Sequence, residues 1–93
     1  MVVENDQSFQ CGLYTVYDRI AQQYGPIYEA VNEAVAIRAY VVMMKDTEFP
    51  DDYELWKVGY HNKVTGKLEM EKPKVVEVSV GAFMKRSLDH EQS

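Results

Sequence analysis

The sequence predicts an α+β domain in which one helix packs on a small antiparallel sheet. Three observations support this prediction: a helical pattern over residues 33–46, alternating apolar and polar residues on both sides of it, and turn signals between these segments. The chain has 93 residues, which is the length of one small domain. We expect residues 11–82 to form this single domain, residues 1–10 a flexible N-terminal extension, and residues 83–93 a C-terminal tail.

Two strands are expected before the helix. Residues 12–20, GLYTVYDRI, carry aromatic and β-branched side chains at the density of a strand, with apolar groups on both faces. Gly25 and Pro26 interrupt this pattern. Residues 27–32 then form either a second strand that returns beside the first or an extended connection to the helix. The hairpin is the preferred interpretation.

The helix is expected over residues 33–46. Asn32 is a good N-cap, and the carboxylate of Glu33 lies in the first turn, where the helix dipole favours negative charge. Pro50 prevents the helix from continuing further. The apolar side chains expected to face the sheet are Ala34, Ile37, Val41 and Met44, with Val35 and Tyr40 beside them.

Three strands are expected after the helix, which gives the order ββαβββ. Residues 52–62 form the first of them, and Gly66 marks a tight turn into residues 68–72. After Pro73, residues 74–80 alternate again and predict an edge strand. An edge strand can pair with a second copy of the chain, so we expect a homodimer.

The charge balance argues against a protein that coats nucleic acid through bulk electrostatics. The net charge is -5 and the pI about 4.9, whereas such binding needs clustered Lys and Arg. The lysines of the second hairpin form either a local basic strip or a set of solvated charges. Aromatic side chains on the strands are core residues, a protein interface, or platforms on which unpaired bases stack. The candidate nucleic-acid-binding residues are Arg38, Lys63, Lys67, Lys72, Lys74 and Tyr60.

Arg38 lies inside the apolar pattern of the helix and has three interpretations. It can form an ion pair with an acidic neighbour, contact a phosphate or carboxylate group, or stay a free surface charge. The preferred interpretation is the ion pair, and the acidic candidates are Glu33, Asp18 and Asp52.

No pattern in the sequence predicts catalysis. The sequence has no phosphate-binding loop, dinucleotide fingerprint or zinc spacing. Cys11, the single cysteine, has no neighbouring base and is expected to fill apolar space. The acidic residues between positions 46 and 54 either bind a cation or, as we prefer, cap turns. We therefore expect no enzyme activity, no cofactor and no metal.

The sequence also predicts a soluble intracellular protein. The opening residues lack the basic and apolar regions of a secretory leader, and the longest apolar stretch is too short to span a bilayer. A lone cysteine suits a reducing cytoplasm. We expect no membrane partner.

Two long segments resemble the small non-structural protein of gokushoviruses, which are microviruses with circular single-stranded DNA that infect bacteria. The family pattern Y-S-V-x-D is matched by residues 14–18 with Thr in place of Ser, and A-x-R by residues 36–38. The pattern P-x-D-Y-x-L-x-x-[IV]-G is matched by residues 50–59, and a Thr-Gly-Lys turn closes the match. The resemblance covers roughly residues 13–72. The N-terminal extension, a short helix-to-strand connection and the valine-rich C-terminal segment depart from the pattern.

The resemblance implies a non-structural, non-enzymatic phage protein that acts in viral DNA replication or packaging in the host cytoplasm. It would act by binding single-stranded DNA or the replication and packaging machinery. The acidic balance supports a second hypothesis, an inhibitor or adaptor that binds a host protein, because acidic proteins can mimic nucleic acid or occupy basic grooves.

Overall fold

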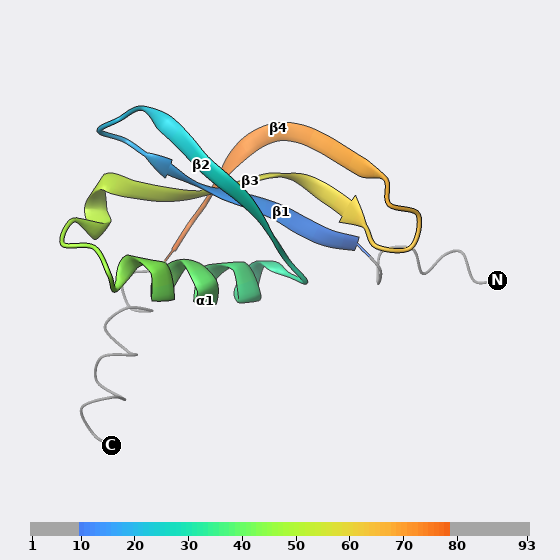
Figure 1. Cartoon of the computed structure of the whole chain (residues 1–93), viewed down its shortest axis with the longest axis horizontal. Coiled ribbons are helices and arrows are strands. Elements are labelled where there is room, and N and C mark those ends of the chain that lie inside the picture. The colour runs from blue at the N-terminus through green and yellow to red at the C-terminus, as the bar shows by residue number, and fades with distance from the viewer. Residues whose placement is uncertain (1–9, 79–93) are drawn as a thin grey trace, which may run out of the picture.

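The structure, a computed structural model, describes residues 10–78 of the chain. In this part of the chain the element order is β1 (Gln10–Asp18), β2 (Gln23–Ala30), α1 (Glu33–Met44), a 3-10 turn (Pro50–Asp52), β3 (Tyr53–Asn62) and β4 (Leu68–Val76). The strands form one antiparallel sheet in the order β2-β1-β3-β4, and α1 lies along one face of it (Figure 1). The predicted α+β class, with one helix on an antiparallel sheet, is confirmed.

The first hairpin, β1–β2, closes earlier than the sequence pattern indicates. The Asp18 carboxylate accepts hydrogen bonds from the N–H groups of Ile20 and Ala21, each at 3.0 Å, and Gln22 adopts a φ of 60°. β2 therefore starts at Gln23 and passes through Pro26, whereas a strand was expected only from residue 27. An edge strand tolerates proline because one side of it needs no N–H donor. The hairpin interpretation is confirmed.

Helix α1 begins at the predicted N-cap and buries most of the predicted face, with Ala36 in place of Ala34. The Asn32 side chain accepts a hydrogen bond from the Val35 N–H at 2.9 Å, and the helix ends at Met44 rather than at residue 46. Ala34, expected to face the sheet, is exposed, because α1 is apolar around much of its surface and contact with the sheet selects the buried side. The buried residues are Ala36, Tyr40, Val41 and Met44.

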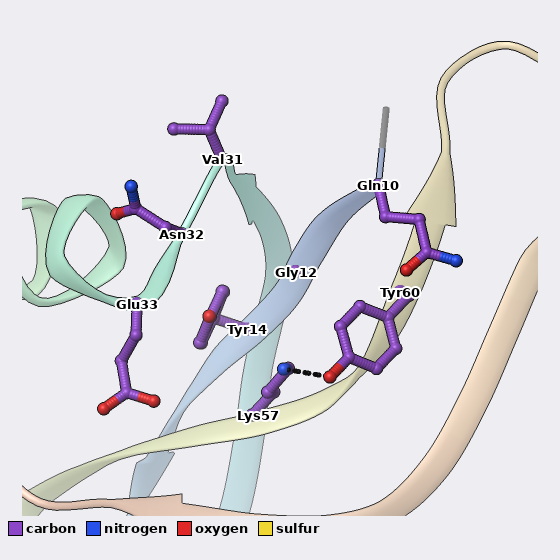
Figure 2. Close-up of a pocket in the computed structure, with 8 residues that line it drawn as sticks. All are labelled: Gln10, Gly12, Tyr14, Val31, Asn32, Glu33, Lys57 and Tyr60. Atoms are coloured by element: carbon purple, nitrogen blue, oxygen red, sulfur yellow. Dashed lines mark hydrogen bonds between the residues drawn. The ribbon is translucent and has the colours of Figure 1, made fainter. Parts of the chain in front are cut away.

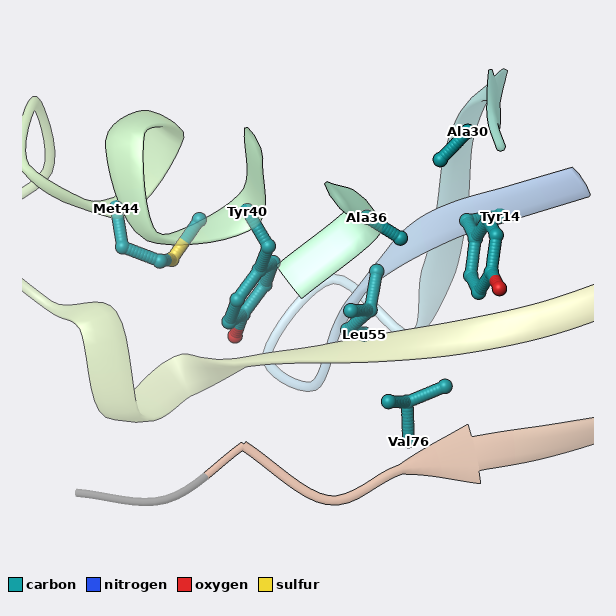
Figure 3. Packing of buried hydrophobic residues seen from close by; sticks show 7 residues of the cluster. All are labelled: Tyr14, Ala30, Ala36, Tyr40, Met44, Leu55 and Val76. Atoms are coloured by element: carbon teal, nitrogen blue, oxygen red, sulfur yellow. The ribbon is translucent and has the colours of Figure 1, made fainter. Parts of the chain in front are cut away.

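The core lies between α1 and the sheet face that it covers (Figure 3). Tyr14 and Leu55, on the two central strands, are each only 1% exposed. Ala36 and Tyr40 approach them from the helix, and Val76 extends the same cluster from β4. Full burial of a leucine stabilises the folded state by about 1.5–3 kcal/mol. These contacts fix the helix on one face of the sheet.

The second hairpin, β3–β4, confirms one prediction and corrects another. Gly66 has a φ of 81°, and its N–H donates to the Asn62 carbonyl at 2.8 Å, as expected for the turn. The segments 68–72 and 74–80, however, were expected to be separate strands. Residues 68–76 form the single strand β4, which passes through Pro73 as an edge strand. The observed order is therefore ββαββ.

Some boundary predictions fall outside the described residues. These are most of the N-terminal extension (1–10), the tail (83–93) and the end of the predicted strand 74–80; Gln10 itself begins β1. Within residues 10–78, no helix has the length and apolar character needed to cross a bilayer.

Candidate nucleic-acid interface

The sheet face opposite α1, here called the open face, carries apolar side chains that no described helix or strand covers (Figure 1). Strand alternation places Thr15 and Tyr17 on it, because Tyr14 on the same strand belongs to the helix-side core. Ile27 at 55% and Met70 at 56% exposure show that both edges of this face meet solvent. Apolar groups gathered on an exposed face are typical of a binding surface. Its larger members are Tyr17, Tyr24, Ile27, Trp56, Leu68, Met70 and Val75.

Three rings on the open face, Tyr17, Tyr24 and Trp56, form what we call the aromatic cluster. The ring centroids of Tyr17 and Tyr24 are 4.6 Å apart, and Trp56 lies 6.2 Å from Tyr17 and 5.7 Å from Tyr24. Register explains the cluster, since Tyr17 pairs with Tyr24 on β2 while Trp56 pairs with Thr15 on β1. Tyr24 is half exposed. The cluster is therefore a packed group of rings with an accessible edge.

Lys63 is bound to an acidic partner in this structure. Its Nζ donates to Glu29 Oε1 at 2.8 Å, and the other oxygen of Glu29 lies 2.7 Å from His61 Nδ1. The hydrogen bond from Lys63, followed by the one with His61, lowers the pKa of Glu29 below its ordinary value of 4.5. Glu29 therefore takes one of the three N–H groups of Lys63 and offsets its charge, which leaves two N–H groups for a phosphate.

The remaining predicted lysines are exposed but spread along the second hairpin. Lys67 lies in the turn, and Lys72 and Lys74 lie on β4. Lys74 pairs in register with Lys57 of β3, so these two side chains share the helix-side face of the sheet. The structure thus places predicted basic residues at several positions around the hairpin, rather than in one patch.

Arg38 lies away from the hairpin, on the outward side of α1. It follows Ala36 and precedes Tyr40, which both face the sheet, and its own side chain is exposed. The expected ion pair is absent from the described part of the chain, where the salt bridges are those of Glu29. The prediction failed because the acidic candidates Glu33, Asp18 and Asp52 do not lie within salt-bridge distance of the exposed arginine.

Tyr60 lies in a pocket on the helix side of the sheet, not beside the aromatic cluster (Figure 2). Lys57 Nζ donates to the Tyr60 hydroxyl at 2.6 Å and lies 3.9 Å from its ring centroid. Lys57 was not among the predicted site residues. The available signal was its position between Trp56 and Val58, in the apolar part of the strand.

The remaining candidates for chemistry, the cysteine and the acidic residues, form no metal-binding group within residues 10–78. Cys11 is a partly buried free cysteine on β1. Among residues 10–78, no group of three or more His, Cys, Asp or Glu side chains is arranged to hold a metal ion. The Asp51 and Asp52 carbonyl oxygens instead accept hydrogen bonds from Arg19 at 2.9 Å, which ties the first hairpin turn to the 3-10 turn.

Together these features define a class: a small α+β domain with one helix on a four-stranded antiparallel sheet and an aromatic open face. The model of a family described as phage ORF5 protein matches residues 11–83, which is more than half of the chain. The chain therefore belongs to the phage ORF5 protein family and is a bacteriophage accessory protein. No curated protein and no solved structure matches it.

Proposed function

We propose that this phage protein acts in viral DNA replication or packaging in a gokushovirus, by binding single-stranded DNA on the open face of its sheet. The observation that supports the proposal is the aromatic cluster, which presents the half-exposed Tyr24 beside Tyr17 and Trp56. An aromatic platform contributes about 1–3 kcal/mol per stacked base. Duplex DNA keeps its bases paired and stacked, so single strands are expected to bind more tightly.

Electrostatics must play a secondary role in this binding. The net charge of -5 disfavours a long phosphate backbone, so phosphate contacts have to be local. The candidates for these phosphate contacts are the predicted lysines of the second hairpin, Lys63, Lys67 and Lys72. Three phosphate contacts on a single strand would give a log–log salt slope of about -2. A shallow salt dependence therefore distinguishes this mode from binding by a basic groove.

Trp56 provides the readout, because it is the single tryptophan of the chain and belongs to the aromatic cluster. Titration of the full chain with a poly-pyrimidine oligonucleotide at low salt should quench its fluorescence. Tyr24→Ala should weaken binding about 5- to 150-fold, which corresponds to about 1–3 kcal/mol. Phe49→Ala is the matched control, since Phe49 is equally an exposed ring, at 63%, but lies outside the sheet. Thermal unfolding of both variants checks that the fold is retained.

A second experiment tests whether the hairpin lysines contribute to binding. The triple variant Lys63→Ala, Lys67→Ala, Lys72→Ala should bind less tightly and show a salt slope closer to zero. Unchanged affinity and slope would remove these lysines from the interface. Absence of any binding by the unaltered chain at low salt would overturn the DNA proposal as a whole.

A protein partner is the second candidate function, and the acidic charge favours it. Exposed apolar side chains such as Ile27 and Met70, on a chain of net charge -5, suit a protein surface with a basic rim. The partner would be a component of the replication or packaging machinery, or a host protein that the phage protein inhibits. Capture of one stoichiometric partner together with no retention on single-stranded DNA would favour this function.

The proposal involves binding without catalysis or a cofactor, in the cytoplasm of the bacterial host. It also includes a homodimer formed through the exposed edge of β4, although Pro73 removes one N–H donor from that edge. Light scattering at tens of micromolar should show two copies. A monomer under these conditions would contradict the dimer without affecting the DNA proposal.

A further inference from the structure

A pocket on the helix side of the sheet is not used by the proposed function. It lies where the N-terminus of α1 approaches β1 and β3, has a volume of about 360 Å³ and is open to solvent (Figure 2). The pocket and the aromatic cluster occupy opposite faces of the sheet, because Tyr14 belongs to the helix-side core whereas Thr15 and Tyr17 alternate onto the open face. The pocket is therefore separate from the proposed DNA-binding surface.

Tyr14 provides a buried donor in this pocket. Its side chain is only 1% exposed, yet its hydroxyl forms no hydrogen bond with any of residues 10–78. Figure 2 accordingly draws a single hydrogen bond among the lining residues, between Lys57 and Tyr60. Burial raises the pKa of Tyr14, so the hydroxyl keeps its proton. The hydroxyl oxygen itself is not fully enclosed, since none of the buried side-chain oxygens of the described residues lacks a hydrogen-bond partner, so it can donate to an acceptor in the pocket.

The Tyr14 ring packs against Gly12, and Tyr14 lines the pocket, where a ligand can reach its hydroxyl. A Cβ added at Gly12 would meet the Tyr14 ring and hydroxyl at 2.5–2.8 Å. The absence of a side chain at Gly12 thus gives the ring its place on the pocket floor. A larger residue at position 12 would therefore force the Tyr14 side chain to shift.

Lys57 adds a cation to the same pocket. One of its N–H groups is used by the Tyr60 hydroxyl, which leaves two for a ligand. Burial lowers the pKa of Lys57, but the Tyr60 hydrogen bond and the neighbouring Tyr14 and Glu71 outweigh burial, so the pKa is raised above 10.5. Lys57 is therefore charged at neutral pH.

The N-terminus of α1 completes the donor side. The Asn32 side chain and carbonyl accept the N–H groups of Val35 and Ala36. The first two N–H groups of the helix, those of Glu33 and Ala34, receive no such cap from Asn32 and carry the positive end of the helix dipole. The Glu33 carboxylate also lines the pocket and partly offsets the charge of Lys57.

We propose that this pocket binds a carboxylate group, held by the Lys57 ammonium and the Tyr14 hydroxyl. A carboxylate carries one negative charge, which Lys57 can balance beside Glu33. A phosphate monoester carries about -1.5 to -2 charges and would be repelled by Glu33. A phosphodiester has one charge but two substituents, which obstruct approach to the buried Tyr14 hydroxyl. A terminal, planar group with two acceptor oxygens fits two donors on one wall.

The carboxylate can belong to a small free acid or to an acidic side chain of a polypeptide, and two probes separate these sources. Acetate represents the free acid, and glutamate blocked by acetylation and amidation represents the side chain. Each is titrated into the ¹⁵N-labelled full chain, and the amide signals of Gly12 and Glu33 are followed by NMR. Saturable shifts with either probe are expected, and the tighter probe identifies the source. No saturable shift with either probe would overturn the proposal.

Variants test the two donors separately. Tyr14→Phe deletes only the hydroxyl and should weaken carboxylate binding about tenfold or more, and Lys57→Met should do the same. Lys67→Met and Tyr24→Phe, outside the pocket, are the matched controls. Without ligand, Tyr14→Phe should unfold at about the same temperature as the unaltered chain, because it removes no hydrogen bond among residues 10–78, whereas a structural role of the hydroxyl would lower that temperature. An affinity in both pocket variants equal to that of the unaltered chain, or binding of dimethyl phosphate as tight as acetate, would overturn the assignment. The oligonucleotide titration is independent of this result.

Discussion

Gly59 is the position where one added methyl group should destabilise the fold most directly. A Cβ there would overlap the Glu69 carbonyl oxygen and lie 3.0 Å from the Met70 Cα, so β3 and β4 would have to separate. Overpacking of this kind costs about 1–3 kcal/mol, and a backbone obstacle places it in the upper half of that range. Replacing glycine restricts the unfolded chain and returns about 0.4–1 kcal/mol. Gly59→Ala should therefore lose about 1–2.6 kcal/mol of unfolding free energy.

The assay is thermal and urea unfolding followed by circular dichroism. For a domain of this size the loss corresponds to a drop in Tm of about 4–21 °C. Gly25→Ala is the matched control, because its Cβ would make only an ordinary contact, 3.4 Å from the Val16 carbonyl oxygen. A Tm for Gly59→Ala equal to that of Gly25→Ala would refute the argument, since it would mean that β4 shifts away from β3 at no cost.

Three further predictions concern single interactions, each measured by urea unfolding. Asn32→Ala removes the N-cap of α1 and should cost about 1 kcal/mol. Tyr28→Phe loses the hydrogen bond to the Ala36 carbonyl at 2.9 Å, for about 0.5–1.5 kcal/mol at neutral pH. Burial raises the pKa of Tyr28 from 10.0 to about 12, so its contribution is complete below pH 10.0 and is lost as the pH rises toward 12; an equally steep alkaline loss in the variant would contradict this assignment. The pKa of Glu29 is lowered, so its contribution is present above pH 4.5 and is lost at lower pH. Wild type and Glu29→Gln should converge in acid, and a constant difference would exclude the linkage.

The sequence was sufficient to predict those ends of helices and strands that are set by interactions between residues close together in the chain. Asn32 caps α1 through its own side chain, and Gly66 closes the second hairpin at a positive φ, as predicted. Local signals failed at prolines. Pro26 and Pro73 were interpreted as breaks, but both lie within strands, because β2 and β4 are the edges of the sheet. Strand order is a long-range property, so the sequence could not show which strands lie at an edge.

The candidate site depends even more on tertiary structure. The sequence by itself determined the class of fold, the charge of the chain and the supply of aromatic and basic residues. The sheet register then brought Tyr17, Tyr24 and Trp56 together, while helix packing separated Arg38 from the hairpin lysines and enclosed Tyr14 and Lys57 in one pocket. Composition and periodicity specify which residues are present and which faces are apolar. Only pairing between distant strands, and the face of α1 that contacts them, decides which side chains meet, because these contacts join residues far apart in the chain.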